Sequence, residues 1–244
     1  MKRFIGVVVG VILLFMIVFL FIVLNTPDYG LEEISEYEDF IEYTKDLKTD
    51  IYTVEATELI EYEETAFKYL ESQTGETSIF VVKTGSDFQI KSGCFFQNAQ
   101  IEEVIQGDAQ LCGKEIRLLR DRGVIIYKDM EEAVYVNTLP AVNVMKPENR
   151  YLVFCEEAEI SYALSVPLYR VAISPYALLN IDKDDEHAIS DCEMVTFIRD
   201  GYEFEELVAP YGNWIDQEFM GNSDETLEVF LSVKNELLKK YNLR

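Results

Sequence analysis

Carboxylates gather between Asp182 and Glu193, at positions from which a calcium loop takes its ligands. Counted from Asp182, oxygen-bearing side chains stand at positions 1, 3, 5, 9 and 12. Calcium takes about six to eight oxygens, and a glutamate at the last position can supply two of them. Asp182, Asp184, Glu186 and Glu193 therefore form a candidate calcium site. However, His187 stands where the sharp turn favours glycine, so an acidic hairpin loop is an alternative interpretation.

His187 is the chain's only histidine, which limits the catalytic chemistry that the protein could perform. A serine or cysteine nucleophile with a histidine base must use it, yet there is no G-x-S-x-G elbow and the cysteines stand in strand-like contexts. One histidine also rules out a three-histidine metal centre. No pair among the 45 acids stands out as a sugar-hydrolysing couple. The sequence therefore carries no catalytic signature and indicates no cofactor.

Four cysteines, Cys94, Cys112, Cys155 and Cys192, allow three disulfide pairings. Cys94 and Cys112 flank consecutive predicted strands, so a bridge between them is the first candidate. Burial as small apolar residues explains the same cysteines without any bridge. There is no CxxC pair and no accompanying histidine, so the pattern is not that of a zinc site.

Aromatic residues cluster in the segment 201–220, where glycine and proline predict a long loop. Tyr202, Phe204, Tyr211 and Trp214 either hold this loop against the core or form a patch that binds a partner. The surrounding acids would suit a basic partner.

Residues 4–24 form an uninterrupted apolar run of 21 residues. At about 1.5 Å per residue, such a helix is roughly 31 Å long and spans a bilayer. Lys2 and Arg3 precede it and only acids follow closely, which predicts a cytoplasmic N-terminus. The run exceeds a cleaved signal core and lacks small residues at its end, so it is typical of a signal anchor. Gly6 and Gly10 form a G-x-x-x-G pattern that could let two anchors dimerise, although glycine is common in membrane helices.

The charge of the chain is strongly one-sided. All 45 acids follow residue 27 and two of the 21 bases precede it, so the remaining part has a formal charge of −26. Such a field repels nucleic acid and anionic polymers, and it favours cations or a basic protein. An acidic surface also simply keeps an exposed domain soluble.

Changes of hydrophobic period divide the chain into four segments. Residues 1–27 are the cytoplasmic stub and anchor, and 28–76 have an acidic helical pattern. From 77 to 200 short β-branched and aromatic runs predict antiparallel strands, with a turn at Pro147 and Asn149 before the strand 151–155. Residues 201–244 combine the aromatic loop with a C-terminal amphipathic helix capped by Asn222 or Ser223. The predicted fold class is thus an N-terminal transmembrane helix plus a mainly-β (α+β) exterior domain, an antiparallel OB-like barrel or sheet with flanking helices.

The order of motifs in residues 78–182 is similar to that of exported bacterial OB-like barrel domains related to netrin-like and metalloproteinase-inhibitor-type domains. The resemblance rests on Gly107, which follows a strand in a "QG" turn, and on Tyr151, Leu152 and Phe154 in a "YL-x-F" strand. The chain departs from the pattern in three places: Glu148 and Asn149 stand where glycine is usual, and Cys155 replaces a leucine. The inhibitors chelate zinc through a free N-terminal cysteine, which the anchor excludes here. The resemblance therefore implies a binding barrel without specifying its ligand.

We therefore expect a single-pass membrane protein of a bacterial envelope with the bulk of its chain extracytoplasmic. Its expected function is that of a binding or adaptor module, which contacts the lipid bilayer through residues 4–24 and binds a basic envelope protein but no nucleic acid. The alternative is an exported hydrolase or cation-binding domain that uses the acidic loop 182–193.

Overall fold

The computed structural model describes residues 34–51, 77–91, 93–120, 124–127, 133–137, 142–158, 166–172, 174–183, 187–189, 193–199, 202–221 and 223–244. The predicted anchor, with Gly6 and Gly10, lies outside these residues, as do residues 52–76 of the predicted acidic helical segment. Within the described ranges, no helix is long and apolar enough to cross a membrane.

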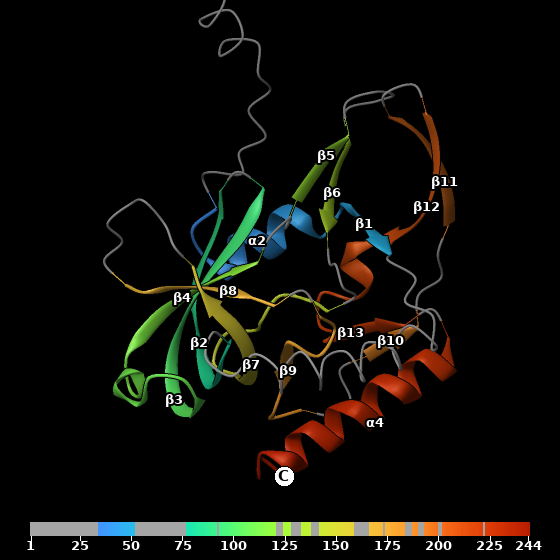
Figure 1. Ribbon diagram of the computed structural model, residues 1–244. Helices are drawn as coiled ribbons and strands as arrows, with labels where there is room; N and C mark the ends of the chain where they lie inside the picture. The colour runs from blue at the N-terminus through green and yellow to red at the C-terminus, as the bar shows by residue number, and fades with distance from the viewer. Residues whose placement is uncertain are drawn as a thin grey trace, which may run out of the picture. The chain divides into compact units, whose positions relative to one another are not determined.

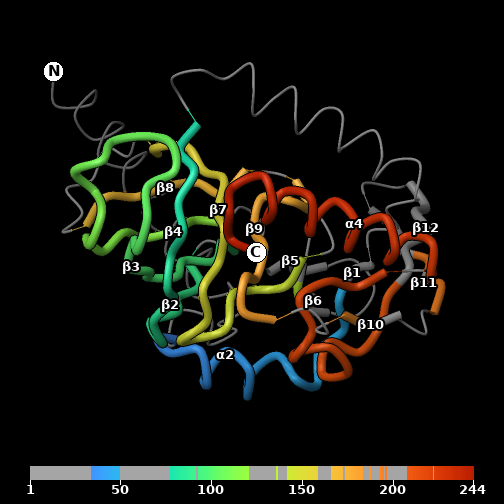
Figure 2. The backbone as a smooth tube through the Cα atoms, turned by 90° about the horizontal axis from the view of Figure 1, so that it is seen from below, coloured from blue at the N-terminus to red at the C-terminus, as the bar shows by residue number. Residues whose placement is uncertain are grey.

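Five strands close into a barrel in the order β2-β3-β4-β8-β7, with β7 pairing back to β2 (Figures 1 and 2). Only β4 and β8 run parallel, and every other neighbouring pair in the ring is antiparallel. A short strand, β9, pairs with β7. The predicted β-barrel is therefore confirmed. The strands are β2 (Thr77–Lys91), β3 (Cys94–Gln106), β4 (Glu115–Arg120), β7 (Arg150–Glu157), β8 (Leu168–Val171) and β9 (Leu178–Asn180).

The barrel forms because its strands bury large apolar side chains, and β2 and β7 bury consecutive residues on both of their faces. Phe80, Val82, Ile101 and Leu152 have no exposed surface, and Phe154 is almost as fully buried. Each such side chain contributes roughly 1.5–3 kcal/mol when it leaves water. One contiguous apolar core therefore spans the barrel strands and continues to the C-terminal helix.

The C-terminal helix α4 (Asp224–Lys240) packs its apolar stripe against this core. Ser223 is its N-cap, since the Ser223 hydroxyl accepts a 3.2 Å hydrogen bond from the Thr226 amide. Phe230, in the middle of the stripe, stacks on Phe219 with ring centroids 4.0 Å apart. The predicted helix and its contact with the β domain are thus both present.

A second sheet takes strands from distant parts of the chain, in the order β11-β12-β1-β6-β5 (Figure 1). The prediction of one β segment followed by a long aromatic loop was wrong here, because residues 202–210 form a strand that pairs with β1 and β11. A short parallel pair joins β10, which precedes β11 in sequence, to β13, which follows β12. The elements are α2 (Tyr37–Thr44), β1 (Lys48–Ile51), β5 (Val124–Tyr127), β6 (Ala133–Asn137), β10 (His187–Ile189), β11 (Glu193–Arg199), β12 (Tyr202–Pro210) and β13 (Phe219–Gly221).

An aromatic cluster joins α2 to the barrel and to the end of β12. The ring of Phe40 on α2 lies 4.4 Å from that of Phe88 on β2 and 5.3 Å from that of Phe95 on β3. It also meets Tyr211 edge-on at 5.9 Å, and Tyr211 in turn meets Trp214 at 5.7 Å. Since Phe40 is fully buried, the predicted membrane-proximal helix is an integral part of the folded domain.

Candidate binding site

A β-bulge interrupts the pairing of β2 with β3. Between the paired residues Thr84 and Phe88, β2 has three residues where β3 has only Asn98. The Phe88 amide donates to the Ser35 carbonyl at 3.1 Å, so β2 leaves β3 locally and contacts the N-terminal part of the domain. Bulges bend a strand and redirect its side chains, and they are common beside functional sites. This bulge opens the face of the barrel on which the candidate site lies.

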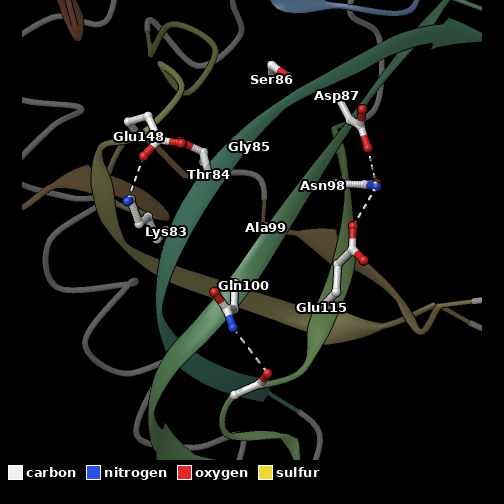
Figure 3. A pocket seen from close by; sticks show the side chains of 11 residues that line it. Lys83, Thr84, Gly85, Ser86, Asp87, Asn98, Ala99, Gln100, Glu115 and Glu148 are labelled. Carbon is white, nitrogen blue, oxygen red and sulfur yellow. Dashed lines mark hydrogen bonds and ion pairs between the residues drawn. The ribbon is translucent and has the colours of Figure 1, made fainter.

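A polar cavity of about 550 Å³ lies over the bulge (Figure 3). Its lining includes Gly85 and Gly113, which have no side chain to fill it, and Ala99, which belongs to the apolar core. Polar side chains from β2, β3, β4 and the turn before β7 also line the cavity. They are Lys83, Thr84, Ser86, Asp87, Asn98, Gln100, Glu115 and Glu148.

The side-chain amide of Asn98 holds two carboxylates at one end of the cavity. Its Nδ2 donates to Oδ2 of Asp87 at 2.9 Å and to Oε1 of Glu115 at 2.8 Å. Arg117 Nε donates to Asn98 Oδ1 at 2.9 Å and so fixes the orientation of the amide. The two carboxylate oxygens therefore lie within about 6 Å of each other. We call Asp87, Asn98 and Glu115 the carboxylate fork.

Lys83 and Glu148 form an ion pair at the opposite end, with Nζ and Oε2 2.6 Å apart (Figure 3). Hydrogen bonding to Glu148 raises the pKa of Lys83. Glu148 has φ of 65°, a left-handed conformation that costs a non-glycine residue about 1–2 kcal/mol. The turn predicted from Pro147 and Asn149 is present, with its left-handed residue at Glu148. The Thr84 carbonyl holds the turn by accepting from the Glu148 amide at 2.9 Å.

The cavity is negatively charged overall. Among its lining residues three carry carboxylates, Asp87, Glu115 and Glu148, whereas Lys83 alone is cationic. None of the lining residues is aromatic. Its chemistry is therefore that of a hydrogen-bonding, cation-attracting surface.

The structure gives two of the predicted calcium ligands other partners. Asp182 accepts from Nε and Nη2 of Arg150 at 2.9 and 2.6 Å, and from the Arg150 amide at 2.9 Å. Glu193, on β11, forms an ion pair with Lys48. Asp184 and Glu186 lie outside the described residues. Within the part of the chain that the structure describes, no group of three or more potential ligands is placed to hold a metal.

The predicted aromatic partner patch is wrong for Tyr211 and Trp214. Tyr211 and Trp214 are 0% and 1% exposed, so neither presents a surface to a partner. Tyr211 donates its hydroxyl to Oδ1 of Asn143 at 2.6 Å, and its burial raises its pKa. Tyr202 and Phe204 lie in β12. The prediction failed because it treated a paired strand and a buried turn as loop.

The structure does not bring Cys94 and Cys112 together, and no disulfide joins them. Cys94 begins β3, whereas Cys112 donates its thiol to the carbonyl of Glu102, eight residues further along the same strand. That stretch of strand is roughly 26 Å long, far beyond the ~7 Å between Cα atoms that a disulfide can bridge. The predicted pairing is therefore wrong. Cys155 is buried, which raises the pKa of its thiol, and Cys192 lies outside the described residues.

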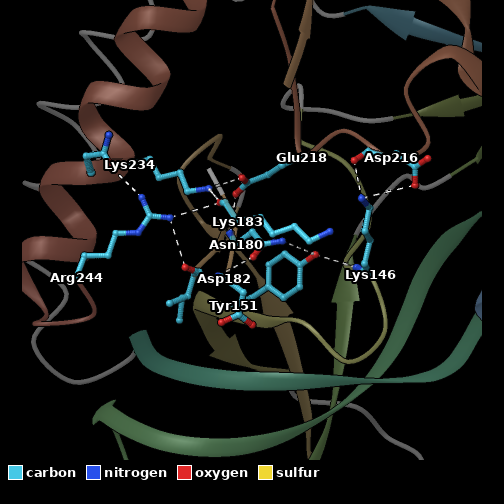
Figure 4. A network of polar contacts seen from close by, with 11 residues as sticks. Lys146, Tyr151, Asn180, Asp182, Lys183, Asp216, Glu218, Lys234 and Arg244 are labelled. Carbon is cyan, nitrogen blue, oxygen red and sulfur yellow. Dashed lines mark hydrogen bonds and ion pairs between the residues drawn. The ribbon is translucent and has the colours of Figure 1, made fainter. Parts of the chain in front are cut away.

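A buried polar network that sequence reasoning missed joins α4 to the barrel (Figure 4). Lys234 is only 1% exposed, and its ammonium bonds to Oε2 of Glu218 and to the Lys183 carbonyl. Oε1 of Glu218 accepts from the Asn180 amide at 2.6 Å. The Asn180 side chain contacts the Tyr151 hydroxyl at 3.4 Å. In the sequence, Lys234 falls on the apolar face of α4. A lysine at such a position indicates that a buried partner compensates its charge, and this could have predicted the network.

No protein-family model matches this chain, and a search of curated proteins finds no significant relative. The site is therefore interpreted from its own geometry.

Replacing Lys234 by methionine would leave the Glu218 carboxylate buried without its cation. We expect a loss of about 3–5 kcal/mol in the free energy of unfolding, measured by urea denaturation of the full chain in detergent. The double variant Lys234→Met/Glu218→Gln should recover part of this loss, because no buried charge remains. Lys239→Met, at an exposed position on the same helix, is the control and should change stability by less than about 0.5 kcal/mol. If Lys234→Met and Lys239→Met lost the same free energy of unfolding, the buried pair would have no special role.

The thiols should differ in reactivity according to their burial. In the native protein a maleimide reagent should modify the exposed Cys112 quickly and the buried Cys155 only after unfolding. Mass spectrometry of peptides labelled under denaturing, non-reducing conditions should also find Cys94 and Cys112 modified. Protection of both cysteines, relieved by a reductant, would contradict the structure. In Cys112→Ser, labelling of Cys94 after denaturation should be the same as in the unmodified protein, because Cys112 is not its disulfide partner.

The ion pair of Asp182 should make stability depend on pH. Hydrogen bonds from Arg150 lower the pKa of Asp182 below its ordinary 3.8, so the carboxylate stabilises the fold above that pH and stops doing so as pH falls through the lowered value. Asp182→Asn should therefore lose up to about 1 kcal/mol at pH 7, a small value because the pair is partly exposed. The difference from the unmodified protein should vanish in acid. A urea-unfolding series from pH 7 to 2 tests this, and a difference that persists at pH 2 would argue for a purely packing role.

Proposed function

We propose that this protein is a membrane-anchored, extracytoplasmic binding module of a bacterial envelope, and that its barrel holds a basic partner protein. The observation that carries the proposal is the open polar cavity over the β2 bulge, where Asp87, Glu115 and Glu148 outnumber the single cation Lys83. Binding sites need a concave surface with a few converging polar groups, and this cavity supplies both. The partner would act as the cation that the surface attracts.

Support for the location comes from the sequence. The apolar run 4–24 has the length of a membrane span, and Lys2 and Arg3 lie on its N-terminal side. A chain in this orientation carries its acidic domain outside the cytoplasm. The adaptor role follows because the anchor would keep the cavity near the membrane and within reach of other envelope proteins.

The closed barrel supports the proposal of an OB-like fold. The strands pair in the ring order β2-β3-β4-β8-β7, and β4 and β8, the third and fifth barrel strands along the chain, are parallel. This arrangement is consistent with a five-stranded Greek-key barrel of the OB type. Gly107, which carries part of the resemblance, has φ of 119°, and a Cβ there would lie 3.0 Å from Ser78 Oγ. Glu148 stands where the related domains use glycine, and it has the left-handed φ that glycine favours. Both observations support a netrin-like relationship.

Binding of a nucleic-acid strand fits this barrel poorly. Barrels that bind single strands combine aromatic platforms with a positive groove. The lining residues of this cavity include no aromatic residue and carry more acids than bases. A basic protein segment suits the surface better.

The alternative function, a hydrolase or cation-binding domain that uses the loop 182–193, has less support. Asp182 is held by Arg150 and Glu193 by Lys48, so two of its four proposed ligands already have cationic partners. We therefore favour the binding module.

Photo-crosslinking in native membranes tests the proposal. A photoreactive amino acid at Gln100, an exposed residue of the cavity, should capture a basic protein. Gly85→Leu should abolish this capture, because a Cβ at Gly85 meets only the Asn98 carbonyl, at 3.9 Å, and the leucine would fill the cavity without disturbing the fold. Gln89, exposed on the same strand but outside the cavity, is the matched control position.

Capture from Gln100 that survives Gly85→Leu, or equal capture from Gln89, would refute the cavity as the binding site. Membrane fractionation of the same cells tests the anchor independently, since a full-length chain found in the soluble fraction would refute the proposed location.

A further inference from the structure

The three carboxylates of the cavity are not equivalent, and this difference identifies the group that the cavity could recognise. Glu148 has its charge compensated by Lys83, 2.6 Å away. Asp87 and Glu115 instead share the neutral amide of Asn98, and no ion pair to either of them occurs within the described chain. The carboxylate fork is therefore the end of the cavity at which no ion pair compensates the negative charge.

The fork is held open by its own hydrogen bonds. Arg117 binds Oδ1 of Asn98 from the far side, so both amide hydrogens of Asn98 face the carboxylates. Each ionised carboxylate has about four lone-pair positions, of which Asn98 uses one. The remaining acceptors can bind a ligand without breaking this arrangement. Two like charges within about 6 Å repel each other, and a cation placed between them relieves the repulsion.

An organic cation fits the fork better than a metal ion. Calcium takes about six to eight oxygens. Across the described residues, no group of three or more potential metal ligands converges. A guanidinium group is planar, carries five N–H donors and is weakly hydrated, so it suits two separate carboxylates better than a compact ammonium does.

We propose that the carboxylate fork binds the guanidinium group of an arginine side chain in the partner. This inference rests on the proposed function and names the chemical group that the same cavity selects. The cavity volume of about 550 Å³ accommodates an arginine side chain, and Gly85 and Gly113, which have no side chain, leave room for its aliphatic stem.

Saturation-transfer difference NMR on the full chain in lipid nanodiscs tests the inference. The probes are acetyl-arginine amide and acetyl-citrulline amide, which have nearly the same shape but differ in charge. We expect saturable binding of the arginine probe, at least about tenfold tighter than binding of the citrulline probe, because hydrogen bonds between charged groups are the stronger ones.

Asp87→Asn/Glu115→Gln should weaken binding of the arginine probe by about tenfold. Both replacements keep an oxygen that can accept from Asn98, so the fork keeps its shape while losing its charge. The matched control is Glu103→Gln/Glu228→Gln, which removes two negative charges from exposed positions outside the cavity and should leave binding unchanged.

Equal binding of the two probes, equal weakening by the control variant, or no saturable signal would each overturn the inference. If the double variant of the fork fails to fold, the comparison of probes on the unmodified protein decides. The proposed function can fail separately. If the arginine probe binds selectively but crosslinking at Gln100 is not position-specific, the fork binds guanidinium and the partner proposal is refuted. If crosslinking is specific but the arginine probe shows no selectivity, the partner proposal stands and the inference about the fork is refuted.

Discussion

The fold depends on one buried amide, that of Asn143. Its Nδ2 donates to the carbonyls of Trp214, Ile215 and Gln217 at 3.0–3.2 Å, and its Oδ1 accepts from the Tyr211 hydroxyl. A turn that buries several carbonyls must satisfy them internally, since water cannot reach them. Asn143, only 2% exposed, does this for the turn after β12. Its side chain thus fixes the path by which the second sheet leads back to α4.

Further polar contacts tie the segment around Asn143 to the barrel, so the barrel and the turn form one cooperative structure. Arg120, at the end of β4, donates to the carbonyls of Val142 and Asn143 at 2.7 and 2.8 Å, and its burial lowers its pKa to about 10. Gln97 of β3 exchanges hydrogen bonds with the backbone of Met145. Buried polar groups that pair in this way favour a single arrangement, because a shift leaves a costly unpaired group.

Local features of the fold could be predicted from the sequence, whereas long-range pairing could not. The short β-branched and aromatic runs predicted strands in the part of the chain that forms the barrel, and Ser223 was recognisable as an N-cap. No local pattern indicates that β4 pairs in parallel with β8 or that β12 pairs with β1. The Cys94–Cys112 prediction failed for the same reason, since nearness in sequence was taken for nearness in space. The candidate site escaped prediction because Asp87, Asn98 and Glu115 meet only through a bulge and the register of three strands.

The conformation of Glu148 connects the strain of the barrel with its site. Glycine would adopt φ of 65° at no steric cost, so a glutamate there makes the turn before β7 less stable. Strained residues persist where the surrounding structure holds them, and they concentrate at functional sites. Here the Glu148 amide bonds to the Thr84 carbonyl while its carboxylate neutralises Lys83 at the cavity wall. Without that carboxylate, Lys83 would offset the charge of the fork. The strained glutamate therefore preserves the negative field of the cavity.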